Sequence, residues 1–236
     1  AYEYRLSLVG SEMCIETGAE QAAAFGSAGT PAIAEDGEIY FTYWNGTLNT
    51  GFDLGAPSLG SPAIGPNDSI MVGTINGRLL SISPAMAENW HYDVAGTIND
   101  INSSPAVGDD SSVYFGVTDN HVYALNSDGT LRWTYDTGGP VDSSPALDDE
   151  AVYVVGGPDG HARLYALDRS DGSVRWSVTI GGRSVLASSP AIGYGNMVYV
   201  VSQDGNLFAI GPAGPLPPSD AMAQAVSPFE IDLRGA

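Results

Sequence analysis

Lysine is absent from this 236-residue sequence, and all eight of its basic residues are arginine. They face 28 acidic residues, so the formal net charge is −20. A surface of this charge repels nucleic acid and anionic membrane surfaces, and we expect neither as a partner. An acidic, lysine-free composition suits a high-salt setting, and it also arises in a GC-rich genome; the sequence leaves both readings open.

Cysteine and long apolar runs are equally scarce. Cys14 is the only cysteine, which excludes an internal disulfide and a metal site built from several cysteines. No apolar run approaches the roughly 20 residues that a membrane-spanning helix needs. The first residues show no basic region, apolar stretch and cleavage site in succession, so a secretion signal was either removed or never included. The short motifs of zinc proteases, α/β-hydrolases and P-loop proteins are absent too.

What the sequence does have is a repeat. The motif (S/T)-P-A-(I/V/L) occurs five times, and its prolines lie 31, 43, 40 and 45 residues apart, at Pro31, Pro62, Pro105, Pro145 and Pro190. After each motif come a polar turn, an apolar run, a tight Asn-Gly or Asp-Gly type of turn and a further apolar run, which are signals of strands and hairpins. In the complete units a second turn leads to a fourth run that carries a tryptophan. These tryptophans are Trp90, Trp133 and Trp176, spaced 43 and 43 residues apart.

The repeat predicts an all-β fold, a β-propeller of four-stranded antiparallel blades. A parallel β-helix has a much shorter period, and helical repeats need a 3.6-residue period that this sequence lacks. The proline suits the first residue of each innermost strand, where no N–H is needed. The tryptophans are expected to fill the gaps between neighbouring blades, as structural residues.

The predicted organisation has three parts. Residues 1–29 form an N-terminal segment, residues 30–211 form the repeats, and residues 212–236 form a proline-rich tail or linker. The five predicted units are 30–59, 60–102, 103–142, 143–187 and 188–211, alone or as part of a larger propeller. The first unit is short: 15 residues separate Gly46 from Ser61, against 27 between Gly77 and Ser104, so about one strand is missing.

The N-terminal segment has two interpretations. Residues 8–15, LVGSEMCI, resemble the translation of a transposase adapter used to make sequencing libraries. We therefore interpret about residues 7–18 as an assembly artefact, which makes the chain a metagenomic fragment. Alternatively, residues 2–10 form a genuine strand that closes the last blade, because the fifth unit ends at residue 211 without a tryptophan strand.

The third and fourth units also carry a family signature. The stretches ALNSDGTLRWTYDTGG and ALDRSDGSVRWSVTIGG resemble the hallmark of the PQQ-like β-propeller repeat, A-x-(D/N)-x-x-(D/T)-G-x-x-x-W with a trailing glycine. The resemblance covers residues 30–211. Quinoprotein alcohol dehydrogenases share the repeat, as does the propeller lipoprotein of the outer-membrane β-barrel assembly machinery. It implies a scaffold and leaves the activity open.

The resemblance does not carry over a catalytic site. A resemblance to the dehydrogenases would imply a site that binds PQQ, together with a calcium or lanthanide ion and an aspartate base. Many members also have a pair of adjacent cysteines. The sequence lacks that cysteine pair and the length of eight large blades. We therefore assign no catalytic, cofactor-binding or metal-binding residue, and we expect neither PQQ nor calcium to be bound.

Other polar residues give weak signals. His91, His121 and His161 are scattered over the units, which favours surface positions over metal ligation. The pairs Asp109-Asp110 and Asp148-Asp149 recur in the turn after the motif, where solvated turn residues are expected more often than calcium ligands.

The remaining candidate is a surface. The loops that lead into the first strand of each blade gather on one face around a central funnel, where propellers usually bind a partner. Asn102, Asp142 and Arg183 are the candidate positions in these loops. The first hypothesis is a non-catalytic, extracytoplasmic module (periplasmic, cell-surface or secreted) that binds or scaffolds a protein or another ligand. The alternative is a fragment of a larger PQQ-dependent quinoprotein dehydrogenase, or of a multidomain enzyme with a propeller sensor domain.

Overall fold

The computed structural model describes residues 26, 29–96, 99–158, 160–183 and 188–211. The segment 7–18 and the tail 212–236 lie outside these residues, so their interpretation stays a prediction. The described residues form antiparallel strands and short 3₁₀ turns. They include no helix with the length and hydrophobicity that crossing a membrane requires. The strands and their antiparallel sheets confirm the predicted all-β architecture.

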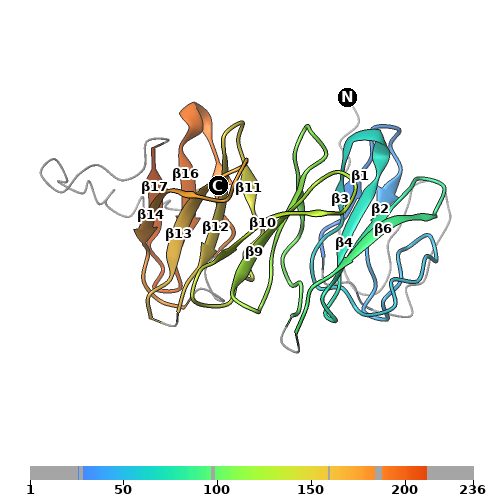
Figure 1. Ribbon diagram of the computed structural model, residues 1–236, viewed down its shortest axis with the longest axis horizontal. Coiled ribbons are helices and arrows are strands. Elements are labelled where there is room, and N and C mark those ends of the chain that lie inside the picture. The colour runs from blue at the N-terminus through green and yellow to red at the C-terminus, as the bar shows by residue number, and fades with distance from the viewer. Residues whose placement is uncertain (1–25, 27–28, 97–98, 159, 184–187, 212–236) are drawn as a thin grey trace, which may run out of the picture.

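Five sheets stand side by side along the longest axis of the molecule (Figure 1). In each sheet the strands pair with their neighbours in sequence order, and every pairing is antiparallel. The first blade has two strands, β1 (Ala32–Ile33) and β2 (Ile39–Tyr40). The complete blades contain β3 (Ala63–Ile64), β4 (Ile70–Gly73), β5 (Arg78–Ile82) and β6 (Glu88–Asp93); β7 (Ala106–Val107), β8 (Val113–Gly116), β9 (His121–Leu125) and β10 (Leu131–Asp136); and β11 (Ala146–Leu147), β12 (Ala151–Gly156), β13 (Arg163–Asp168) and β14 (Val174–Thr179). The fifth blade has β15 (Ala191–Ile192), β16 (Val198–Val201) and β17 (Leu207–Ile210).

The shortened first blade has lost the outer part of its second hairpin. The N–H of Leu54 donates to the carbonyl of Gly46, as that of Val94 donates to Gly77 in the second blade. The two bonded residues are eight positions apart in the first blade (46 to 54) and 17 positions apart in the complete blade (77 to 94). Two isolated bridges, Thr42 to Leu48 and Thr47 to Asp53, remain where the third and fourth strands would run. Both outer strands are thus reduced, whereas the sequence suggested that one was missing.

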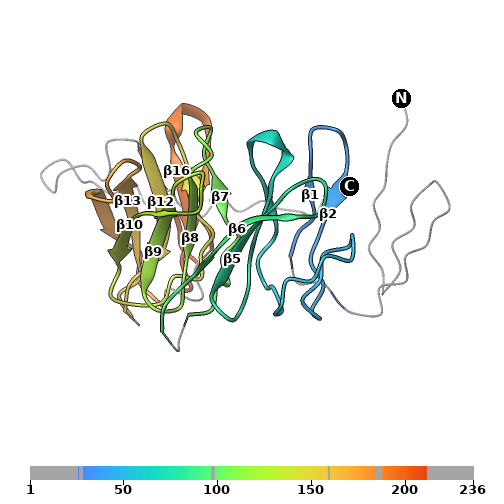
Figure 2. The same cartoon turned by 45° about the vertical axis from the view of Figure 1, so that its right-hand side comes forward.

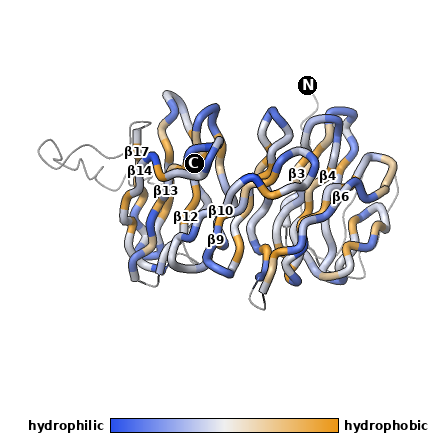
Figure 3. Tube along the Cα trace, in the orientation of Figure 1, coloured by the Kyte–Doolittle hydropathy of each residue, from blue (hydrophilic) through white to orange (hydrophobic). Residues whose placement is uncertain are grey.

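The hydrophobic core lies between the blades. Because side chains alternate along a strand, each blade has two apolar faces. We call the face that packs against the preceding blade the leading face and the one that packs against the following blade the trailing face. Between the third and fourth blades, for example, the trailing residues Tyr114, Val122 and Ala124 contact the leading residues Val152, Val154 and Tyr165. Figure 3 shows the alternation of apolar and hydrophilic residues along the chain.

Tryptophan closes the outer part of these interfaces. The indole N–H of Trp90 donates to the carbonyl of Ser127 in the next blade at 3.0 Å, and that of Trp133 donates to Arg169 at 3.0 Å. Each ring also covers a glycine of the next blade's turn: a Cβ on Gly129 would lie 2.6 Å from the Trp90 ring, and one on Gly172 would lie 2.7 Å from the Trp133 ring. Trp176 packs into the cluster between the fourth and fifth blades. The glycine of the turn is therefore required by the indole as well as by its positive φ.

A ladder of hydrogen bonds joins the inner ends of the blades. The N–H of the serine or threonine in each of the first four motifs donates to the hydroxyl of the serine at the same position in the next blade. The pairs are Thr30 to Ser61 (2.7 Å), Ser61 to Ser104 (2.8 Å), Ser104 to Ser144 (2.9 Å) and Ser144 to Ser189 (2.9 Å). The proline that follows has no N–H, and the strand as assigned begins one residue later, at the alanine. The motif therefore supplies one donor and one acceptor per blade for inter-blade bonding.

We predict that Gly172→Ala destabilises the fold more than Gly205→Ala. Both glycines have positive φ, at +75° and +80°, so both variants carry the backbone strain of an alanine in that region. Only Gly172 lies against an indole, and nothing lies within 4 Å of a Cβ on Gly205. Overpacking at Gly172 adds about 1–3 kcal/mol to its cost. Urea unfolding of both variants measures the difference, and equal losses would show that the indole does not press on the turn.

We also predict that Ser144→Ala lowers the free energy of unfolding by about 1–3 kcal/mol, because it leaves the partly buried N–H of Ser104 without an acceptor. Ser127→Ala is the matched control. The Ser127 side chain is exposed, and the carbonyl that accepts from Trp90 is unchanged by this substitution. The control is expected to stay within about 0.5 kcal/mol of the parent. If chemical denaturation gave equal effects for Ser144→Ala and Ser127→Ala, the hydrogen-bond ladder would not contribute to stability.

Candidate functional site

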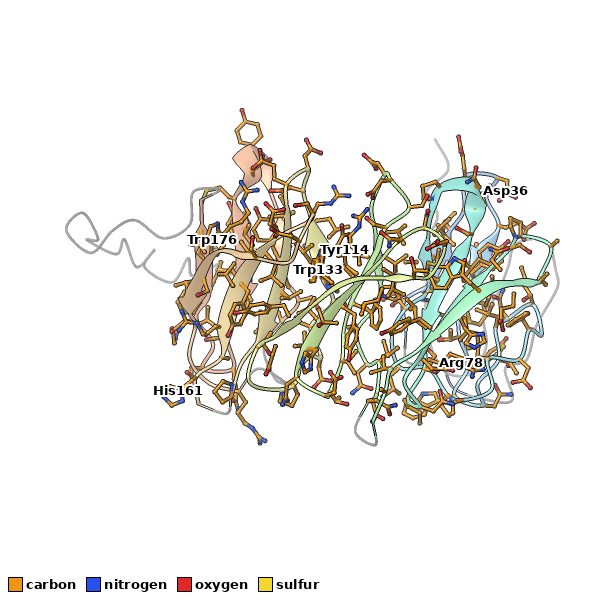
Figure 4. The ribbon with its side chains drawn as sticks, viewed as in Figure 1. Asp36, Arg78, Tyr114, Trp133, His161 and Trp176 are labelled. Carbon is orange, nitrogen blue, oxygen red and sulfur yellow. The ribbon has the colours of Figure 1, made fainter. Side chains whose placement is uncertain are left out.

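The two ends of the strands form two different faces of the molecule. The loops into each first strand and the turns between second and third strands form one, which we call the loop face; residues 99–102, 118–120, 138–142 and 180–183 belong to it. The turns between first and second strands and between third and fourth strands form the opposite face. In Figure 4, His161 lies at the loop face and Asp36 lies at the opposite face.

The structure brings two of the three candidate loop residues together. Asn102 and Asp142 immediately precede the inner strands of the third and fourth blades, at equivalent positions. The Asn102 side-chain amide donates to a carboxylate oxygen of Asp142 at 3.0 Å. The side-chain oxygen of Asn102 is enclosed and has no hydrogen-bond partner among the described residues. Asp142 is half-buried, so the pair offers a carboxylate on the loop face, and a carboxylate accepts N–H groups.

Arg183 lies farther along the same face. Its backbone N–H donates to the side-chain oxygen of Gln203 at 2.9 Å, which ties the loop after β14 to the turn between β16 and β17. Gly181 and Gly182 precede it with φ of +76° and +68°, so the chain turns sharply there. No contact joins Arg183 to the Asn102 and Asp142 pair within the described residues.

The opposite face holds an arginine-centred cluster that the sequence did not reveal. Asp110 forms ion pairs with Arg132 of its own blade at 3.2 Å and with Arg169 of the next blade at 3.3 Å. Arg169 also donates to the carbonyl of Asp148 at 3.0 Å and lies over the ring of Tyr114, 5.8 Å from its centroid. The carbonyl of Arg169 accepts from Tyr114 and Trp133. This cluster therefore links the third and fourth blades at their outer ends, and Figure 4 shows Tyr114 and Trp133 together there.

The carboxylates of this cluster are held in the charged form. Partial burial opposes ionisation of Asp110, but hydrogen bonds from Ser112 and Arg132 outweigh it and lower the pKa of Asp110. Burial likewise opposes the charge of Asp148, and bonds from the Tyr153 hydroxyl and from two backbone N–H groups lower its pKa. These aspartates are therefore bonded parts of the fold, in addition to being turn residues.

A shallow depression of about 530 Å³ opens beside the cluster. It is lined by Asp109, Asp110, Arg132, Asp149, Arg169 and Ser170. Both arginines are already paired with carboxylates, so the depression has little net attraction for an anion. Among residues 29–96, 99–158, 160–183 and 188–211 no group of three or more histidine, cysteine and acidic side chains is placed to share a metal ion.

Part of this cluster has a signal in the sequence. An arginine directly precedes the tryptophan in the third and fourth units, and an acidic turn follows the motif in the same units. In the fourth blade the equivalent Arg175 pairs with Glu150 and, at 3.3 Å, with Asp168. The coincidence of these two features could have predicted an ion pair within each blade. The bond from Arg169 to the preceding blade has no such pattern.

Comparison with solved structures finds the same architecture in proteins of distant sequence. BamB from Moraxella catarrhalis superimposes with a TM-score of 0.54 at 16% identity, over 90% of this chain and 86% of that one. A quinohemoprotein alcohol dehydrogenase from Pseudomonas putida gives 0.53 at 16% identity, over 65% of this chain and 32% of the dehydrogenase. This chain thus spans about a third of that enzyme. Identities this low establish the fold alone.

Sequence comparison gives a family. A search of curated proteins found no match. The family model described as "Outer membrane protein assembly factor BamB" matches residues 76–215, which is more than half of the chain. The matched region holds the second hairpin of the second blade and all strands of the three blades that follow. The chain therefore belongs to the PQQ-like β-propeller repeat family that this model describes.

Proposed function

We propose that the chain is a non-catalytic module that binds or scaffolds a protein partner through its loop face. Membership in a family described by an assembly factor supports a role in association. The observation that carries the proposal is the pair formed by Asn102 and Asp142, which holds a half-buried carboxylate on the loop face. A hydrogen-bond donor from a partner would bind the Asp142 carboxylate.

The position of the pair suits recognition of a partner. It is set by two inner strands, whose serines are joined by the ladder, so the two side chains are held by rigid neighbours. Rigid placement reduces the entropy that binding must overcome. The partner group that fits is an N–H donor with a positive charge, because the acceptor is the Asp142 carboxylate. We infer an extracytoplasmic location from the same family membership.

Photo-crosslinking in the periplasm of a Gram-negative host tests the proposal. A photoreactive residue is placed at Asp100, which is exposed in the loop that contains Asn102, and separately at Asp128, which is exposed on the opposite face. We expect a discrete protein adduct from position 100 and none from position 128. Similar adducts from both positions would contradict binding at the loop face.

A variant that removes the charge of Asp142 tests whether the pair formed by Asn102 and Asp142 determines binding of the partner. Asp142→Asn keeps an oxygen that can accept from Asn102 and removes only the charge, so the fold is expected to persist. We expect it to reduce the adduct at position 100 several-fold. Asp128→Asn makes the same change in net charge on the other face and should leave the adduct unchanged. An adduct that is insensitive to Asp142→Asn would rule out this pair as the binding determinant.

The proposal also predicts that the chain does not oxidise alcohols. Incubation with PQQ and calcium, followed by a dye-linked assay with short-chain alcohols, should give rates at the level of the protein-free control. The chain spans 32% of the dehydrogenase that it resembles in fold, so the enzyme's remaining length has no counterpart in the comparison. Turnover above the control would overturn the non-catalytic assignment in favour of a quinoprotein fragment.

A further inference from the structure

The trailing face of the fifth blade is uncovered, although the same positions are buried in every complete blade. Leu207 is 64% exposed, whereas its equivalents Leu79, Val122 and Leu164 are fully buried. Tyr199 is 36% exposed, while Tyr114 and Tyr153 at the same position are 0% and 2% exposed. Val201 is 42% exposed beside them. In the complete blades these positions are covered by the leading face of the following blade.

The leading face of the first blade is uncovered at the other end. Ile39 is 42% exposed, whereas Ile70, Val113 and Val152 at the equivalent position are fully buried. Ile33, which pairs with Ile39 from the innermost strand, is 68% exposed. The trailing side of the same blade is packed normally: Tyr40 and Leu48 are buried against the second blade. Each end of the molecule therefore shows one half of the interface that the chain builds four times internally.

The hydrogen-bond ladder is incomplete in the same complementary way. Ser189 accepts from Ser144, but within the described chain its own N–H has no serine hydroxyl ahead of it. Thr30 donates to Ser61, and its hydroxyl accepts no N–H from a preceding blade among those residues. Within the described residues, a donor is thus left at the fifth blade and an acceptor at the first. The two ends match in hydrogen bonding as well as in apolar surface.

We propose that two copies of this chain associate head to tail, with the trailing face of the fifth blade of one copy packed against the leading face of the first blade of the other. The fifth and first blades lie apart in both views, with β17 and β1 toward opposite sides of Figure 1 and β16 and β1 well separated in Figure 2, so these blades do not meet within one copy. The occupant is a second copy because this chain already presents the complementary face, with the same alternation of apolar side chains. Such a contact joins different surfaces and leads either to a closed ring or to an open chain of copies.

Charge sets the conditions of this association. Each copy carries a formal charge of −20, which opposes contact at low ionic strength. Salt screens this repulsion and leaves the apolar contact intact. Association should therefore increase with salt concentration, in contrast to a contact held by ion pairs.

Sedimentation equilibrium of the 236-residue chain, over a range of protein and salt concentrations, tests the proposal. We expect species of at least twice the monomer mass, favoured by salt. Leu207→Asp and Ile39→Asp should each lower the association constant at least tenfold, because each places a carboxylate in one half of the contact. Tyr194→Asp is the matched control: Tyr194 is fully exposed in the turn between β15 and β16, outside the strands that form the face, and this variant should associate like the parent. Circular dichroism checks that all three variants are folded.

A mixing experiment distinguishes head-to-tail contact from other arrangements. Leu207→Asp keeps an intact first blade and Ile39→Asp keeps an intact fifth blade, so an equimolar mixture should form a heterodimer that grows no further. A parent chain that is monomeric at all concentrations would overturn the proposal, including the case in which residues 1–25 or 212–236 cover these faces. It would also be overturned if Ile39→Asp had no effect, since the fifth blades would then pair with each other, or if Tyr194→Asp had an equal effect.

Discussion

The packing of one blade's apolar face against the next is the interaction on which the rest of this structure depends. The innermost strands have two residues each, and the apolar faces of a sheet must be buried against another element. Burial between blades supplies what each sheet lacks. The Trp133 ring over Gly172 closes the outer end of one such contact, and the bond from Ser104 to Ser144 closes its inner end. The stability of each blade is therefore expected to depend on its contacts with the neighbouring blades, as in other repeat proteins.

This arrangement determines where binding can occur. The middle strands are covered on both faces, so the polar groups that remain available lie at the ends of the strands. On the opposite face many of them are engaged: Asp110 and Arg169 join two blades, and Asp148 is bonded to Tyr153. On the loop face, the Asp142 carboxylate is half-buried and is bonded to Asn102. The family supplies the scaffold, and the loops give each member its own surface.

Much of this fold could be predicted from the sequence because its signals are periodic. The spacing of the motif prolines and of Trp90, Trp133 and Trp176 predicted the all-β propeller of four-stranded blades. The partners of the motif serines could not be predicted, because a recurring residue shows an equivalent position without showing what it contacts. The reach of Arg169 to Asp110, 59 residues earlier, depends on how neighbouring blades are juxtaposed. Asn102 and Asp142 were chosen for their place in the loops, and their mutual bond was not foreseen.

Hydrogen exchange of the backbone amides, measured at a concentration where the chain is monomeric, tests the central role of inter-blade packing most directly. Protection should be greatest in β8, β9, β12 and β13, which are buried on both faces. It should be much lower in β16 and β17, which have the same hydrogen-bonded register but are covered on one face only. Equal protection in these two sets of strands would contradict the account, because it would show that each sheet is stable without its neighbours.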